Sequence, residues 1–181
     1  MNSQKTLKMN KDIILGFLHF ILIAAFQIFV LNGLNIFGYF NPMIYIWFIL
    51  MLPTNTPKWL GLILSFLMGF TVDIFSGQVG FHAAALTFIG LIRPLFISIF
   101  FSGKDIQTNL RPSIAEMSLM TFLPYIVSLV FLHHFVYFTI EIFNFSEFFL
   151  TLLRIVCSTI ITTLLILICD FFFIPKRKLS H

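Results

Sequence analysis

Long apolar runs dominate the chain and recur six times. They occupy 13–31, 36–52, 59–75, 79–102, 114–140 and 148–174, with short polar segments between them. A helix needs roughly 20 apolar residues to cross about 30 Å of hydrocarbon, so runs of this length predict membrane-spanning helices. The runs do not alternate apolar and polar residues as barrel strands do. The pattern predicts an all-α integral membrane protein, a six-helix transmembrane bundle that forms a single domain over residues 1–181.

The composition agrees with this pattern. Of 181 residues, 59% are hydrophobic and 10% are charged, and the mean hydropathy is +1.02. Soluble domains average about 25% charged residues. A soluble protein is therefore excluded, and the segments between the runs are too short to hold a second folded domain.

The second run, 36–52, is the least regular of the six. Gly38, Asn41 and Pro42 interrupt its first half. Proline lacks a backbone donor and disfavours helical geometry in the residue before it. The run is therefore predicted either to cross the membrane or to be tilted or partly re-entrant.

Basic residues sort by loop and indicate the topology. If the chain crosses six times, one side carries Lys5, Lys8, Lys11, Lys58, Lys104, Arg111, Lys176, Arg177 and Lys178. The loops 32–35, 76–78 and 141–146 on the other side contain no Lys or Arg. By the positive-inside rule, both termini are predicted to be cytoplasmic. The net charge of +4 then reflects topology and anionic lipid, not nucleic-acid binding.

Small and polar residues recur along the third and fourth runs. Every fourth position of the third run carries one of Gly61, Ser65, Gly69 and Asp73. The fourth run offers Gly80, Ala83, Ala84, Thr87 and Gly90. Small residues let helix backbones approach closely in lipid, so a tight antiparallel hairpin is predicted, turning at 76–78. The stripe serves either this packing alone or also a partner's helix.

Ionisable side chains inside the runs are costly in hydrocarbon and are candidate sites by default. Besides Asp73 they are Arg93, Glu116, Arg154 and Asp170. Their depths allow an outer pair, Asp73 with Arg154, and an inner pair, Arg93 with Asp170 or Glu116. The alternative is that each group extends to the lipid headgroups.

Catalytic and metal-binding patterns are not found in the sequence. His133 and His134 are adjacent and point about 100° apart on a helix, which does not suit a shared metal. Cys157 and Cys169 are predicted to be small buried residues. An acid–base pair of Asp73 with His82 lacks an accompanying nucleophile. We expect a protein that is not an enzyme and has no cofactor, whose few polar and small side chains serve to grip neighbouring helices.

Residues 69–84, Gly-Phe-Thr-Val-Asp-Ile-Phe-Ser-Gly-Gln-Val-Gly-Phe-His-Ala-Ala, resemble the signature of the MreD family of bacterial rod-shape-determining membrane proteins. Gly69, Asp73 and Gly80 carry the match most directly, with Gly77, His82 and Ala84 in the same run. Asn41-Pro42, Leu52-Pro53 and Trp59 upstream are also similar to that family. The specific part of the resemblance spans about residues 42–93.

This resemblance implies a scaffold of the cell-elongation machinery in the bacterial cytoplasmic (inner) membrane. The implied partner is the single membrane helix of an MreC-like protein. Through it the complex would include RodA, a class B penicillin-binding transpeptidase and, indirectly, MreB. The implied fold is similar to that of the substrate-binding subunits of energy-coupling-factor transporters. The alternative function is therefore that of a membrane subunit that binds a vitamin-type small molecule for uptake.

Overall fold

Long helices make up most of the structure. The computed structural model describes residues 2–34, 41–78, 80–103, 106, 110–142 and 148–173, with side chains from residue 13 onward. Its helices are α1 (Asn2–Phe26), which continues as the π-helix η1 (Gln27–Leu31), α2 (Ile46–Leu50), α3 (Lys58–Ser76), α4 (Phe81–Phe100), α6 (Leu119–Ile142) and α7 (Phe148–Phe173). No strand occurs within these residues.

Five of the helical segments are long and apolar enough to cross a membrane. They are 13–31, 58–76, 81–100, 119–142 and 148–173. Large apolar side chains cover their outward faces, for example Phe29, Leu91 and Phe149, which are 80%, 62% and 84% exposed. Such surfaces are stable in lipid and not in water. The chain is a multi-pass membrane protein, as the apolar runs predicted.

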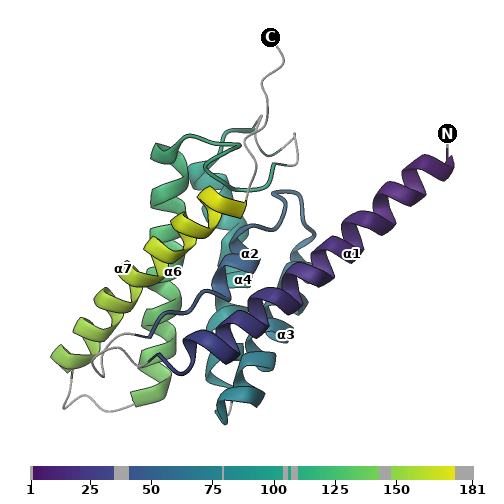
Figure 1. Cartoon of the computed structure of the whole chain (residues 1–181). Helices are drawn as coiled ribbons and strands as arrows, with labels where there is room; N and C mark the ends of the chain where they lie inside the picture. The colour runs from purple at the N-terminus through teal and green to yellow at the C-terminus, as the bar shows by residue number, and fades with distance from the viewer. Residues whose placement is uncertain are drawn as a thin grey trace.

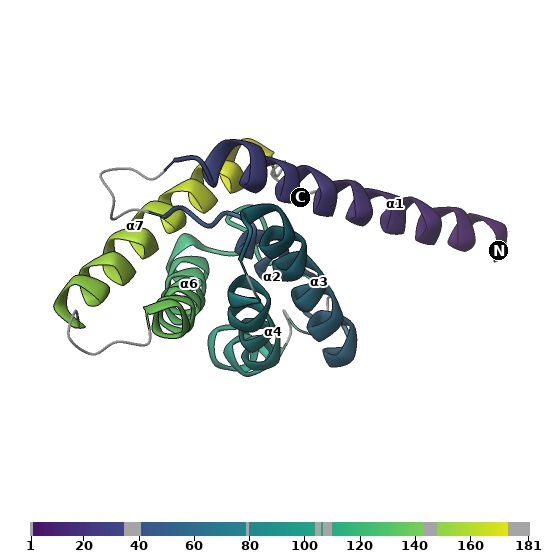
Figure 2. The ribbon, with the colours of Figure 1, turned by 90° about the horizontal axis from the view of Figure 1, so that it is seen from below.

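The helix predicted over 36–52, the second of the six runs, is not confirmed. Residues 36–40 lie outside the described residues, 41–45 are not helical, and α2 is five residues long. The segment 41–52 nevertheless runs from one end of the bundle to the other (Figure 1) and lies among the long helices (Figure 2). Over 41–52 the chain therefore consists of non-helical backbone followed by a short helix, and we call residues 41–52 the inner segment.

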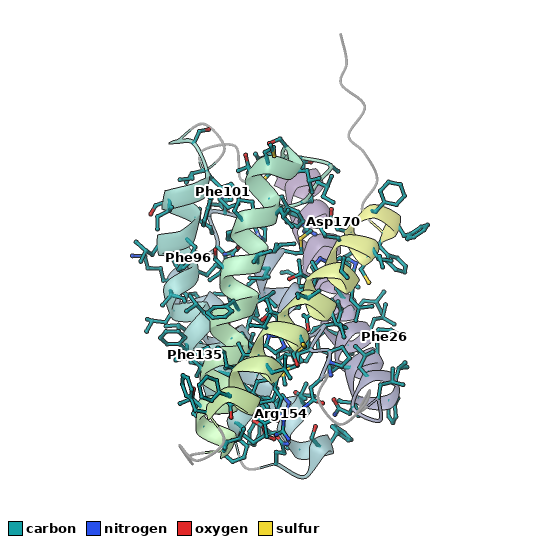
Figure 3. The ribbon with its side chains drawn as sticks, turned by 90° about the vertical axis from the view of Figure 1, so that its left-hand side faces the viewer. Phe26, Phe96, Phe101, Phe135, Arg154 and Asp170 are labelled. Carbon is teal, nitrogen blue, oxygen red and sulfur yellow. The ribbon has the colours of Figure 1, made fainter. Side chains whose placement is uncertain are left out.

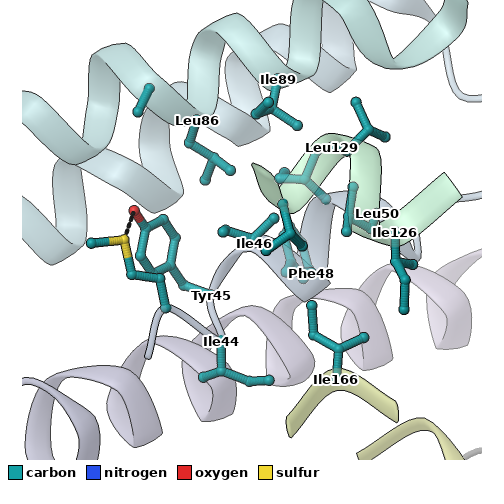
Figure 4. Packing of buried hydrophobic residues seen from close by; sticks show 14 of the residues in the cluster. Ile44, Tyr45, Ile46, Phe48, Leu50, Leu86, Ile89, Ile126, Leu129 and Ile166 are labelled. Atoms are coloured by element: carbon teal, nitrogen blue, oxygen red, sulfur yellow. Dashed lines mark hydrogen bonds between the residues drawn. The ribbon is translucent and has the colours of Figure 1, made fainter. Parts of the chain in front are cut away.

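Burial explains how such a segment exists at membrane depth. Tyr45, Ile46, Ile49 and Leu50 are fully buried. Irregular backbone is tolerated inside a membrane where protein, not lipid, surrounds it. Figure 4 shows the side chains of this segment packed against α4, α6 and α7, where Leu86, Leu129 and Ile166 meet it. The inner segment is the centre of the hydrophobic core.

Side chains of the long helices satisfy the backbone of the inner segment where it is not helical. The N–H groups of Asn41, Met43 and Tyr45 donate to Ser158 Oγ (3.2 Å), Thr162 Oγ1 (3.0 Å) and Gln27 Oε1 (3.4 Å) respectively. Gln27 Nε2 also donates to the carbonyl of Pro42, at 3.1 Å. Gln27 lies where α1 changes into η1. π-Helical turns are rare and often occur where side chains have a specific role. The hydroxyls and the amide thus replace the missing helical partners.

At its other end, the inner segment is held through its carbonyls. Arg93, on α4, donates to the carbonyl of Leu52 and to the hydroxyl of Tyr125. The Tyr125 hydroxyl in turn donates to the carbonyl of Leu50, at 3.2 Å. A cation near the C-terminal carbonyls of a helix also interacts favourably with the helix dipole. Arg93 therefore fixes the end of α2, although it was predicted to pair with an acidic residue.

Some of the basic residues that were predicted to lie on one side of the membrane can be placed in the fold. Lys58 and Arg111 are both exposed and lie near each other in the fold, since the Thr54 N–H donates to the carbonyl of Leu110 at 2.9 Å. The start of α1 and the end of α7 lie at this same end (Figure 1). Lys104, Lys176, Arg177 and Lys178 lie outside the described residues, as do the side chains of Lys5, Lys8 and Lys11.

The first prediction tests whether Thr162 supports the inner segment. Thr162→Val keeps the shape of the side chain but leaves the buried N–H of Met43 without its acceptor, which costs about 1–3 kcal/mol. We expect that loss in the free energy of unfolding, measured by denaturation in detergent. Thr163→Val is the matched control, because the buried Thr163 hydroxyl has no partner among the described residues. Equal stability of the two variants would contradict the role of Thr162.

Candidate functional site

The α3–α4 hairpin contains the motif residues that the sequence singled out. Two glycines with positive φ form its turn, Gly77 at 66° and Gly80 at 82°. Glycine adopts this left-handed conformation without the steric cost that a side chain brings. Gly77 ends α3 and Gly80 precedes α4. The antiparallel hairpin and the position of its turn were predicted correctly.

Asp73 joins the two helices across this turn. Its Oδ1 accepts from the backbone N–H of His82 (3.0 Å) and from His82 Nδ1 (2.9 Å), and its Oδ2 accepts from the N–H of Ala83 (2.9 Å). The first N–H groups of a helix have no partner within it and attract negative charge. Asp73, which is 1% exposed, therefore caps α4 from the end of α3.

Two glycines allow the hairpin helices to touch. A Cβ at Gly69 would lie 2.5 Å from the carbonyl oxygen of His82 and 2.6 Å from the Cα of Ala83. A Cβ at Gly90 would collide with the side chain of Ser65. Ser65 itself is fully buried, and its hydroxyl donates to the carbonyl of Gly61 at 2.7 Å. Gly61 contributes this carbonyl, but a Cβ there would meet open space.

An open, largely apolar groove runs along the outer side of this hairpin. Its volume is about 640 Å³. Small residues line it, among them Gly80, which precedes α4, and Ala83 and Ala84 of α4. Phe66 and Phe70 of α3 and Phe88 of α4 flank them, and all three rings are partly exposed. We call this feature the hairpin groove, and it lies on the surface that the membrane would contact.

The intramembrane charges do not form the predicted pairs. Asp73 and Arg154 are both described, and no ion pair joins them, because the oxygens of Asp73 accept from α4. Arg93 bonds Leu52 and Tyr125, not Asp170 or Glu116. Figure 3 shows Arg154 and Asp170 at opposite ends of α7. Asp73 and Arg93 therefore bond to backbone and hydroxyl groups and not to the charges predicted as their partners.

Asp170 supports the chain that precedes α6. Its Oδ2 accepts from the backbone N–H of Ile114, at 2.8 Å. In the same turn the N–H of Glu116 donates to Ser113 Oγ at 3.2 Å. Residues 113–118 are irregular and α6 starts at Leu119, whereas the sequence predicted a helix from residue 114. The carboxylate of Asp170 therefore holds this partly exposed, irregular turn against α7.

A buried polar network between the helices was not predicted. The Tyr45 hydroxyl lies 2.9 Å from His133 Nε2, and His134 Nε2 lies 3.4 Å from the Thr162 hydroxyl. The Tyr137 hydroxyl donates to Gln78 Oε1, at 2.9 Å. His133 and His134 are each fully buried. Their adjacency in sequence gave no sign of this network, because their partners come from other elements of the chain.

Metal binding finds no support in the described residues. No cluster of three or more His, Cys, Asp or Glu side chains that could hold an ion occurs among them. Cys157 and Cys169 are free thiols and only partly buried, so they are less buried than the sequence predicted. Comparison of the chain with protein-family models, with curated proteins and with solved structures returns no match.

The second prediction concerns the close approach at Gly69. Gly69→Ala forces a methyl group against the backbone of α4 and should destabilise the protein by at least about 1–3 kcal/mol, as overpacking does. Gly61→Ala is the control on the same helix face. With open space around it, this change should be neutral or stabilise by up to about 1 kcal/mol through helix propensity. Thermal unfolding in detergent measures both, and a stable Gly69→Ala protein would disprove the tight contact.

Proposed function

We propose that the chain is a non-catalytic scaffold of the bacterial inner membrane, which binds the transmembrane helix of a single-span partner in the hairpin groove. The observation that carries the proposal is the groove itself, which has small residues on its floor and an apolar lining. The groove lies on the hairpin whose residues 69–84 resemble the MreD signature. The partner is accordingly an MreC-like protein, in a wall-synthesis complex with RodA and a class B penicillin-binding transpeptidase, indirectly connected to MreB.

The shape of the groove suits an elongated apolar occupant. Its lining residues extend from Gly80, just before α4, to Leu91 on α4, which is about 16 Å along a helix. That length is about half of the hydrocarbon thickness. A transmembrane helix that follows α4 therefore contacts it over several turns.

The floor of the groove favours a helix as that occupant. Helices associate in lipid by close packing of their backbones, which small residues allow. Ala84 is exposed and Gly80 is half-buried, so both are available to a neighbour. Asp73 also lines the groove, but its oxygens accept hydrogen bonds from α4. The partner is therefore expected to present an apolar face.

The orientation completes the proposal. The exposed Lys58 and Arg111 and the start of α1 lie at one end of the bundle. We place this end in the cytoplasm by the positive-inside rule. The turn of the hairpin then faces the periplasm, and the groove opens into the outer part of the bilayer.

The third prediction locates the partner by crosslinking. In a background with Cys157→Ser and Cys169→Ser, a photo-crosslinker attached at Ala84→Cys should capture the MreC-like single-span protein in native membranes, identified by mass spectrometry. Leu164→Cys, at a site 53% exposed on α7, should capture lipid and not that protein. Equal capture from both positions would place the partner elsewhere.

The fourth prediction concerns a protein whose groove is filled. Ala84→Phe should occupy the floor of the groove and reduce co-purification of the MreC-like protein about tenfold, which corresponds to roughly 1.4 kcal/mol. Leu164→Phe is the control, and both proteins should remain equally stable because both sites face outward. In rod-shaped cells, Ala84→Phe should produce round cells. Cells of normal shape that instead need an external nutrient would contradict the scaffold and favour uptake.

A further inference from the structure

A second cavity, of about 410 Å³, lies at the end of the bundle where α3 turns into α4. It is a different space from the hairpin groove, with which it shares Gln78. Its lining changes from an exposed rim, which includes Asn32 and Gly33, to a buried floor. On that floor, Gln27, His82 and Tyr137 are 2%, 5% and 2% exposed. We call this space the outer cavity.

His82 is the chemically distinctive group of the outer cavity. Its Nδ1 lies 2.9 Å from Asp73 Oδ1. A carboxylate accepts hydrogen bonds, so it fixes the neutral ring in the form that carries the proton on Nδ1. Nε2 then presents a lone pair that can accept a hydrogen bond. His82, which is 5% exposed, therefore brings one nitrogen acceptor to the wall of the cavity.

The other polar side chains that line the cavity are uncharged. Amide side chains come from Gln27, Asn32, Asn41 and Gln78, and hydroxyls come from Ser76 and Tyr137. None of the described lining residues is Lys, Arg, Asp or Glu. The rings of His82 and Tyr137 lie 4.7 Å apart. Phosphates and carboxylates would find no cationic side chain among the described lining residues, whereas hydroxyl groups would find both donors and acceptors.

We propose that the outer cavity binds an uncharged, hydroxyl-rich group about the size of one sugar ring, with a ligand hydroxyl donating to His82 Nε2. The volume is near the lower end of the roughly 300–1,000 Å³ that small-molecule pockets span. Such a group occurs in free sugars and in the headgroups of glycolipids. This binding is additional to the scaffold function and does not depend on the hairpin groove.

The experiment uses the reactivity of His82. The full chain is placed in phospholipid nanodiscs without sugar detergents, and diethyl pyrocarbonate, which modifies accessible imidazole nitrogens, is added. Modification of each histidine is followed by mass spectrometry. His82 should react through the cavity, whereas the fully buried His134 should not. Failure of His82 to react at a rate above that of His134 would show that the cavity is closed, and would overturn the proposal.

Two sets of probes then identify the source of the ligand. Methyl glycosides of glucose, galactose and mannose test free sugars, and a monoglycosyl diacylglycerol in the nanodisc tests a lipid headgroup. At saturation, one set should slow the modification of His82 about tenfold, equivalent to roughly 1.4 kcal/mol. If neither set slows it, the proposal is overturned.

Matched variants show whether protection arises in the cavity. Tyr137→Phe removes a cavity hydroxyl and should raise the probe concentration needed for half protection about tenfold, as the loss of one good hydrogen bond does. Thr139→Val removes an exposed hydroxyl from the same helix, away from the cavity, and should leave this concentration unchanged. Asn41→Ala tests a second lining residue if Tyr137→Phe does not fold. Protection that survives both cavity variants would contradict the proposal.

The variant Ala84→Phe distinguishes a failure of the sugar-binding proposal from a failure of the scaffold proposal. It fills the hairpin groove but does not line the outer cavity, so sugar protection of His82 should persist in a protein that no longer binds the single-span partner.

Discussion

The structure depends on one constraint: the backbone of the inner segment must find hydrogen-bond partners in a region without water. Each buried peptide group left without a partner costs several kcal/mol in hydrocarbon. Gln27 and Thr162 meet this need on the N–H side, and Arg93 and Tyr125 meet it on the carbonyl side. The five long helices therefore surround the segment, because lipid could not supply these bonds.

This constraint changes the role of the polar residues inside the membrane helices. They were expected to grip neighbouring helices or to pair with one another. Arg93 and Asp170 instead bond to backbone groups of irregular segments, and Asp73 caps α4. A charged side chain that bonds to backbone dipoles needs no ion partner. Small residues do act as expected at Gly69 and Gly90, where helix contact requires them.

Asp73 connects the two proposed binding surfaces. One of its oxygens holds the N–H of Ala83, whose residue lines the hairpin groove. The other holds His82, which lines the outer cavity. Gln78 contributes to both spaces. Residues of the same α3–α4 hairpin therefore line both spaces, and one carboxylate bonds to a lining residue of each.

The sequence by itself determined the membrane class, five of the six helices that it predicted, and the hairpin, because these depend on local properties: the length of apolar runs, the spacing of small residues and the glycines of a turn. The tertiary structure decided the path of residues 41–52, the partners of Arg93 and Asp170, and the polar network around Tyr45, His133 and Tyr137. Their hydrogen bonds join residues as much as 119 positions apart. No local pattern specifies such bonds, because each depends on how the helices are placed around the inner segment.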